Sequence, residues 1–162
     1  LGSHHLFNKD CLYEESIRIP LVFYYPKLFK SNINRWQIAQ IIDIVPTILD
    51  ICGIDIPKFI QGQSLMPVLL GNKQELSNNQ AFIETSKYNI GLRTTSYLFG
   101  MSINPQHPEE VKEDLFLFDL NNDPFEMDNK LLDQSKYEIL GKLKEILINW
   151  NERTPWYFPQ GE

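Results

Sequence analysis

Four short runs of β-prone residues, separated by polar connectors, constrain the fold of this chain more than any other feature. They cover residues 81–85, 90–94, 97–103 and 115–120, and the longest connector between them covers residues 104–114. Strands that follow one another this closely pair in antiparallel fashion, because a parallel pair needs a long crossover connection. The sequence therefore predicts a small four-stranded antiparallel sheet.

One amphipathic helix is predicted after this sheet, from Ser135 to Asn149. Its apolar residues recur at the spacing of a single helical face, and they are Ile139, Leu140, Leu143, Ile146, Leu147 and Trp150. A one-sided helix that follows a small antiparallel sheet lies across that sheet and closes its core. The second half of the chain is thus predicted to have α+β organisation.

The first half of the chain has the pattern of an α/β layer. A short helix over residues 13–18 is predicted to end before Pro20, which restricts the residue that precedes it. The apolar run over residues 21–25 is typical of a strand that is buried on both faces of a mixed or parallel sheet. A further short strand is predicted over residues 36–41.

The clearest helix of the first half is predicted between Asp43 as N-cap and Gly53 as the C-terminal stop, with Pro46 in its first turn. One stripe of this helix is apolar and consists of Ile44, Ile48, Ile51 and Cys52. Ser64 is predicted to cap a second, short helix that stops at Gly71.

Charge and composition narrow the possible functions. The 162 residues carry a net charge of −6, which argues against a nucleic-acid partner because phosphate binding needs a basic face. Apolar runs are broken by Asp or Pro before they reach the length of a membrane span. Cys11 and Cys52 form no disulfide framework; two buried thiols are expected, and whether the two cysteines pair stays open. The sequence predicts no compartment.

The opening stretch, residues 1–21, contains a dense set of motif residues: Leu1, Gly2, His4, Leu6, Lys9, Tyr13, Glu14, Glu15, Ser16, Arg18, Pro20 and Leu21. Their order resembles the sulfatase family of the alkaline-phosphatase-like superfamily, which reads approximately Leu-Gly-Asp-His-Gly/His-Leu-x-x-Lys and then Tyr-Glu-Glu-Ser-x-Arg-x-Pro-Leu. Ser3 departs from it, since the family usually carries Asp there. Further matches lie in residues 43–50, 62–71 and 117–126, so that the resemblance reaches to about Trp150.

This resemblance implies an α/β fold in which the chain is the C-terminal part of a sulfatase. Residues 1–75 would then be a piece of the α/β catalytic domain, and residues 76–162 the small subdomain of sheet and helix. The parent enzyme would cleave the sulfate ester of a small molecule or a glycan with a formylglycine nucleophile and a divalent cation, usually Ca²⁺. The remaining partner implied is the N-terminal catalytic domain.

The resemblance also implies roles for three residues. Lys9 matches the lysine that contacts the sulfate and the leaving group, so it is the candidate catalytic and substrate-binding residue. His4 and His5 are candidates for the mouth and the wall of the substrate pocket. Two structural predictions accompany these roles: an ion pair within the first helix between Arg18 and Glu14 or Glu15, and a structural ion pair of Arg93.

The nucleophile motif, Cys/Ser-x-Pro/Ala-x-Arg, occurs nowhere in the chain. The family's second metal-binding pair would lie just before Leu1. The chain is therefore expected to hold no metal or cofactor and not to hydrolyse an ester by itself, because a catalytic site needs all its members held together.

Three alternatives stay open. The parent enzyme could be a phosphonate or phosphate ester hydrolase of the same superfamily. The chain could be a non-catalytic interaction module, with an apolar face that binds a partner. Gly2 to His5 could be the remnant of a purification tag.

Overall fold

The computed structural model describes residues 2–6, 9–30, 36–104, 106–107 and 110–154. They form two compact units, one of Leu1–Arg18 with Phe82–Glu162 and the other of Ile19–Ala81. The units divide after Arg18 and after Ala81, so the first eighteen residues group with the sheet and not with the segment that follows them. The assignment of residues 1–75 to a catalytic α/β domain stays a prediction.

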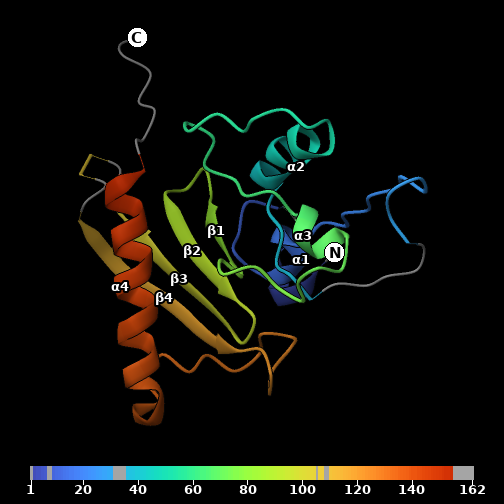
Figure 1. The fold of residues 1–162 in the computed structure, drawn as a ribbon. Coiled ribbons are helices and arrows are strands. Elements are labelled where there is room, and N and C mark those ends of the chain that lie inside the picture. Colours follow the sequence, from blue (N-terminus) through green and yellow to red (C-terminus); the bar gives the residue numbers. More distant parts are fainter. Residues whose placement is uncertain (1, 7–8, 31–35, 105, 108–109, 155–162) are drawn as a thin grey trace. The chain divides into compact units, whose positions relative to one another are not determined.

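The elements follow one another in the order shown in Figure 1. They are the 3₁₀ helix η1 (Ser3–His5), α1 (Glu14–Ile17), η2 (Ile41–Asp43), α2 (Ile44–Ile51), α3 (Met66–Leu69), β1 (Gln80–Glu84), β2 (Asn89–Thr94), β3 (Tyr97–Ile103), β4 (Val111–Asp119), η3 (Gln134–Lys136) and α4 (Tyr137–Arg153).

The predicted four-stranded sheet is confirmed. Its order is β1-β2-β3-β4, and both β2–β3 and β3–β4 pair in antiparallel fashion. Strand β4 begins at Val111 rather than at residue 115, so the connector before it is shorter than predicted. The added residues include the exposed Lys112 and Glu113, whose charges concealed the strand in the sequence. Charged side chains are common on an edge strand because they prevent further pairing.

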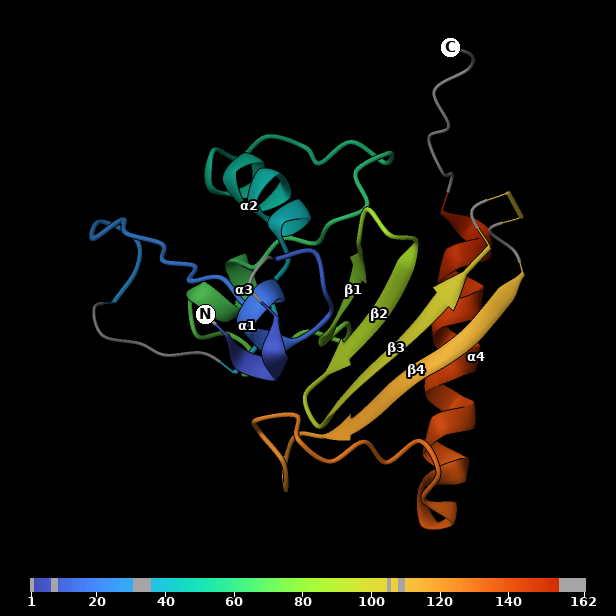
Figure 2. The ribbon, with the colours of Figure 1, turned by 180° about the vertical axis from the view of Figure 1, so that it is seen from behind.

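One face of the sheet is covered by α4, as predicted (Figures 1 and 2). Leu143 and Leu147 of α4 are buried in a core cluster with residues of three strands, namely Ile90, Leu92, Phe99, Met101, Ile103 and Leu117. The helix extends four residues beyond its predicted end, to Arg153. Ile146 was predicted on the buried face, but it is 38% exposed. It lies at the edge of the apolar stripe, where the surface of the helix curves away from the sheet and towards solvent.

The other face of the sheet packs against the N-terminal segment. Leu12 is buried there in a cluster with Leu98, Phe116 and Phe118, and Tyr13 and Ile17 pack against the same cluster. Because side chains alternate along a strand, this face receives the residues that α4 does not cover.

A pair of glycines makes room for Leu12 on this face. Gly91 and Gly100 lie opposite each other in the β2–β3 register. A Cβ atom at Gly100 would lie 2.8 Å from Phe116 and 2.9 Å from Leu12, and a Cβ atom at Gly91 would lie 3.1 Å from Leu12. The absence of side chains at both positions therefore allows Leu12 to approach the sheet closely.

The helix predicted between Asp43 and Gly53 is confirmed as α2, but its capping differs. Asp43 makes no side-chain cap of α2. It is buried, and its carboxylate accepts hydrogen bonds from the N–H groups of Gln40 at 2.9 Å and Gln63 at 2.8 Å. The buried residues of the helix are Pro46 and Thr47, whereas Ile48 of the predicted stripe is 50% exposed.

The second helix of this unit is confirmed as α3. The hydroxyl of Ser64 accepts a hydrogen bond from the N–H group of Met66 at 3.2 Å, and Gly71, with φ +79°, follows the end of the helix. Left-handed backbone of this kind is where glycine is favoured.

The two strands predicted in the first half were wrong. Residues 21–25 and 36–40 form no strand, and Val22 and Tyr24 are 84% and 86% exposed. A strand of this kind needs partners on both sides, and within the described residues these segments have none. The N–H group of Ile38 instead donates to the side chain of Asn79 at 2.7 Å.

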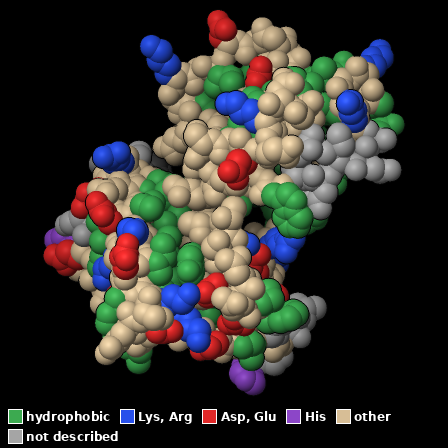
Figure 3. Space-filling view, turned by 60° about the horizontal axis from the view of Figure 1, so that its bottom comes forward, with side chains coloured by type: hydrophobic (Ala, Val, Ile, Leu, Met, Phe, Trp, Pro, Cys, Tyr) green, Lys and Arg blue, Asp and Glu red, His purple; other side chains and the backbone are tan. Residues whose placement is uncertain are grey.

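Both signs of charge are present on the surface. Figure 3 shows acidic and basic side chains next to one another on one face, with hydrophobic side chains exposed between them.

Both cysteines are free, Cys11 half-buried and Cys52 exposed, which corrects the expectation of two buried thiols. Within the described residues, no helix combines the length and the apolar character that a membrane span requires.

The glycine pair gives a testable prediction. Gly100→Ala should destabilise the chain by about 1–3 kcal/mol, because the new methyl group overlaps Leu12 and Phe116. Gly141→Ala is the matched control, since a Cβ atom at Gly141 in α4 meets nothing within 4 Å. It should stabilise the chain by roughly 0.5–1 kcal/mol. Urea unfolding followed by circular dichroism measures both; a neutral effect of Gly100→Ala would show that Leu12 is not packed as described.

Candidate functional site

The candidate site residues lie at the start of the chain, in η1 and the loop that leads to α1. The backbone of His4 and His5 is left-handed, with φ of 51° and 59°. Left-handed backbone is uncommon for residues other than glycine and is concentrated at functional sites.

His4 is held by aromatic stacking and by one acidic side chain. Its ring lies on the ring of Tyr13, with centroids 3.9 Å apart and planes 9° from parallel. Tyr13 in turn stacks on Phe116, with centroids 5.5 Å apart. The Nε2 atom of His4 lies 3.6 Å from the Oε2 atom of Glu15. The side chain of His4, only 10% exposed, is therefore fixed between the sheet and α1.

Lys9 is exposed, and its Nζ atom donates a hydrogen bond to the carbonyl oxygen of Ser16 at 3.3 Å. The next residue, Asp10, has φ 75° and anchors the loop to the turn between β1 and β2. Its carboxylate accepts hydrogen bonds from the N–H group of Ser86, at 2.9 Å, and from the Ser86 hydroxyl. These bonds lower the pKa of Asp10 below its usual value. His4 and Lys9 therefore contact two successive residues of α1, Glu15 and Ser16.

Glu126 is the buried carboxylate of this region, with an exposed fraction of 2%. Both of its oxygens accept from the N–H group of Glu14, the first residue of α1, at 3.0 and 3.3 Å. Burial raises the pKa of Glu126 to about 7; the hydrogen bond from Glu14 and the charge of Arg93 oppose the rise, while the carboxylates of Glu14 and Glu15 add to it. Tyr13 occupies the N-cap position of α1 but its side chain makes no capping hydrogen bond. Glu126 supplies this hydrogen bond instead.

The ion pairs differ in part from those predicted. The carboxylate of Glu14 accepts a hydrogen bond from the Nε atom of Arg93 at 2.7 Å, across 79 residues of sequence. The prediction that Arg93 forms a structural ion pair is confirmed. The prediction that Arg18 pairs with Glu14 or Glu15 was wrong within the described residues: Glu14 binds Arg93, Glu15 lies next to His4, and Arg18 is exposed.

An open hollow of about 770 Å³ lies beside these residues. Its wall is formed by η1, the residues before and within α1, the middle of β4 and the loop after β4, and it comprises Gly2, His4, His5, Tyr13, Glu15, Leu115, Phe116, Phe118, Phe125, Glu126, Met127 and Asn129. The structure therefore brings His4 and His5 together in one wall. Lys9 is not among the described residues of that wall.

One group of side chains has the spacing of metal ligands. Candidate ligand atoms of His4, Glu15 and Glu126 lie within 4.8 Å of one another. Ca²⁺ takes six to eight oxygen ligands, whereas this group offers one nitrogen and two carboxylates, and Glu126 already accepts from Glu14. The group does not fit the calcium that the resemblance implies. The expectation that this chain supplies no ligand to that cation stays a prediction.

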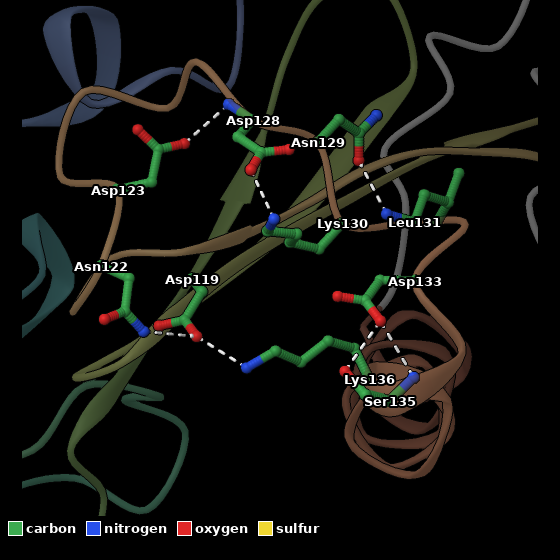
Figure 4. A network of polar contacts seen from close by, with 10 residues as sticks. All are labelled: Asp119, Asn122, Asp123, Asp128, Asn129, Lys130, Leu131, Asp133, Ser135 and Lys136. Atoms are coloured by element: carbon green, nitrogen blue, oxygen red, sulfur yellow. Dashed lines mark hydrogen bonds and ion pairs between the residues drawn. The ribbon is translucent and has the colours of Figure 1, made fainter.

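The match to the family over residues 117–126 is a turn signature, Leu117-Phe118-Asp119-Leu120 followed by Asp123-Pro124 and Glu126. The connection from β4 to α4 explains this signature in structural terms (Figure 4). Asp119, which is buried, accepts from the Nζ atom of Lys136 at 2.7 Å and from the amide of Asn122 at 3.1 Å. The bond from Lys136 lowers the pKa of Asp119. Asp123 accepts from the N–H group of Asp128 at 2.8 Å. These bonds shape the loop that carries Glu126 to α1.

Three contacts of the site could not be found in the sequence: the cap by Glu126, the anchor by Asp10 and the stack of Tyr13 on His4. The signature located Glu126 but gave it no role. No local spacing connects Glu126 with Glu14, since they are 112 residues apart.

Comparisons with known proteins identify relatives of this chain. The chain is 31% identical over 167 residues to N-acetylglucosamine-6-O-sulfatase of Bacteroides thetaiotaomicron, which covers 97% of this chain and 28% of that protein. It is 30% identical over 165 residues to mouse arylsulfatase K, which covers 89% of this chain and 27% of that protein. The chain thus spans less than a third of the length of the curated relatives it matches.

Solved structures share the fold. A protein solved in complex with its substrate, D-glucosamine-2-N,6-O-disulfate, superposes with a TM-score of 0.80 at 28% identity, over 93% of this chain and 31% of that chain. The family model for the C-terminal region of N-sulphoglucosamine sulphohydrolase matches residues 2–153. Since that match covers nearly the whole chain, the protein belongs to the family of sulfatase C-terminal domains described by N-sulphoglucosamine sulphohydrolase.

Proposed function

We propose that this chain is the C-terminal part of a longer hydrolase that cleaves sulfate esters of a small molecule or a glycan. The support is the family match together with relatives that are named sulfatases and are more than three times as long as the matched region. In this proposal the formylglycine nucleophile and the divalent cation come from the part of the parent that precedes the chain. The chain by itself would be inactive.

Within the chain, we propose that Lys9 and His4 contact the sulfate group. The observation that carries this is their common support: Lys9 rests on the carbonyl of Ser16, and His4 rests on the carboxylate of Glu15. A compact ammonium and an imidazole that both contact one short helix can donate to oxygens of a tetrahedral anion and stabilise charge as the ester bond breaks. His5, which is exposed, would form part of the pocket wall.

A sugar sulfate is the substrate class that the relatives favour. One relative is named for N-acetylglucosamine 6-sulfate, and a structural neighbour was solved with a disulfated glucosamine. The hollow beside His4 contains exposed apolar side chains, Phe125 and Met127, which are 73% and 75% exposed. Aromatic and apolar side chains next to a few polar groups are typical of a small-molecule site.

The interaction-module alternative has one observation in its favour. The unit Ile19–Ala81 exposes several large apolar side chains, among them Ile41, Val45, Ile48 and Phe59. Such residues are expected where another part of a parent enzyme covers them, and equally where a separate partner binds. The coding sequence before Leu1 distinguishes the two, because only the enzyme carries Cys/Ser-x-Pro/Ala-x-Arg and metal-binding carboxylates there.

Sulfate binding by the chain tests the proposed roles. In a titration with sodium sulfate at constant ionic strength, followed by two-dimensional NMR, we expect shifts around His4 and Lys9. Lys9→Ala should raise the Kd for sulfate roughly fivefold, because an exposed charge contact contributes about 1 kcal/mol. Lys73→Ala, which removes an exposed charge from the other unit, is the control and should leave the Kd unchanged. Equal affinities of the two variants would contradict the role of Lys9.

The reaction itself is tested on the longer protein. If its coding sequence supplies the nucleophile motif, an aryl sulfate should be hydrolysed faster than the matching aryl phosphonate. The opposite preference would support the phosphonate hydrolase alternative instead.

A further inference from the structure

The position of α1 determines where His4 and Lys9 lie, yet α1 has little apolar anchoring of its own. It has four residues, and none of them is buried. A helix this short is not stable by itself, since one turn costs more conformational entropy than its hydrogen bonds return. Contacts from elsewhere in the fold must therefore hold it.

Glu126 provides such a contact from a distant part of the chain. Its carboxylate accepts the N–H group of Glu14 and so occupies the N-terminal end of α1. A second polar tie to the helix is the ion pair of Glu14 with Arg93, and Ile17 packs against the Leu12 cluster. Glu126 has φ 57°, in the left-handed region, and the loop that carries it is shaped by the bonds of Asp119 and Asp123 (Figure 4). The loop is thus built to present this carboxylate.

The surroundings of Glu126 disfavour its charged form. Titratable and charged groups face it from every element packed against it, namely His4 of η1, Tyr13, Glu14 and Glu15 at α1, and Arg93 of β2. Two of these are carboxylates, and Arg93 already pairs with Glu14. A carboxylate is therefore an unfavourable choice here unless its oxygens are needed as acceptors.

We propose that Glu126 is a positioning residue: by capping α1 it places His4 and Lys9 for contact with the sulfate group. This rests on the proposed function of these two residues. The role proposed for Glu126 is to hold α1 and not to contact the sulfate, because both of its oxygens accept the N–H group of Glu14. It acts through Glu14, whose neighbours Glu15 and Ser16 support His4 and Lys9.

The test compares three variants of the 162-residue chain. Glu126→Ala removes the cap, Glu126→Gln keeps an acceptor oxygen without the charge, and Asp133→Ala removes a cap of the same kind from η3, where Asp133 accepts the N–H group of Ser135 at 3.0 Å. We expect Glu126→Ala to raise the Kd for sodium sulfate roughly fivefold, the size of effect that follows loss of a helix cap. Glu126→Gln should stay within about twofold of the parent chain, and Asp133→Ala should be unchanged.

A second readout separates this inference from the proposed function. NMR contacts between the rings of His4 and Tyr13, and between Tyr13 and Phe116, should weaken in Glu126→Ala and persist in Asp133→Ala. If these contacts and the sulfate affinity both survive in folded Glu126→Ala, the positioning role is wrong, whatever the effect on stability. If Lys9→Ala does not alter sulfate binding but the ring contacts are lost in Glu126→Ala, then Glu126 positions the segment and the role of Lys9 is what fails.

The pH dependence of stability gives an independent prediction. Because the pKa of Glu126 is raised to about 7 in the fold, its stabilising contribution is complete below the unfolded value near 4.5 and is lost as pH rises through 7. The chain should therefore melt at a lower temperature at pH 8 than at pH 5.5. Glu126→Gln should reduce this difference and melt at least as high as the parent chain at pH 8. An unchanged difference in Glu126→Gln would assign the titration to another group.

Discussion

The packing of Leu12 against the glycine pair of β2 and β3 is the contact on which the candidate site depends. It buries the N-terminal segment on the face of the sheet opposite α4, and it brings Tyr13 onto the aromatic rings of β4. Apolar burial of this kind is strong but not directional. It holds the segment on the sheet, and the orientation of α1 is then left to polar contacts.

Those polar contacts come from three separate places in the chain. Asp10 is bound at the β1–β2 turn, Glu14 pairs with Arg93 of β2, and Glu126 caps α1 from the loop after β4. Charge-assisted hydrogen bonds are more directional than apolar packing and are stronger where water is excluded. The result is a four-residue helix held firmly enough to support His4 and Lys9. Burial raises the pKa of Glu126, and groups kept for position are often not optimal for stability.

The sequence predicted the elements whose pattern is local. The four strands and α4 were recovered because alternation and a helical period are visible within one segment, and the caps at Gly53 and Gly71 followed from backbone preference. Two of the failures share a cause, because the contacts that decide them involve residues distant in the sequence. Residues 21–25 and 36–40 are apolar enough for strands but find no pairing partner in the described chain. Arg18 is correctly spaced to pair with Glu14, but Arg93 reaches it from the sheet.

In the candidate site, too, local patterns were readable from the sequence and distant contacts were not. The sequence by itself determined the family, the register of His4, His5 and Lys9, and the position of Glu126 within a turn signature, because each is a pattern of neighbouring residues. Only the tertiary structure decided that His4 lies on Tyr13, that Arg93 pairs with Glu14 and that Glu126 caps α1. The Glu14–Arg93 contact spans 79 positions of the sequence and the Glu14–Glu126 contact spans 112. Both depend on how the N-terminal segment docks on the sheet, and no local spacing in the sequence encodes this docking.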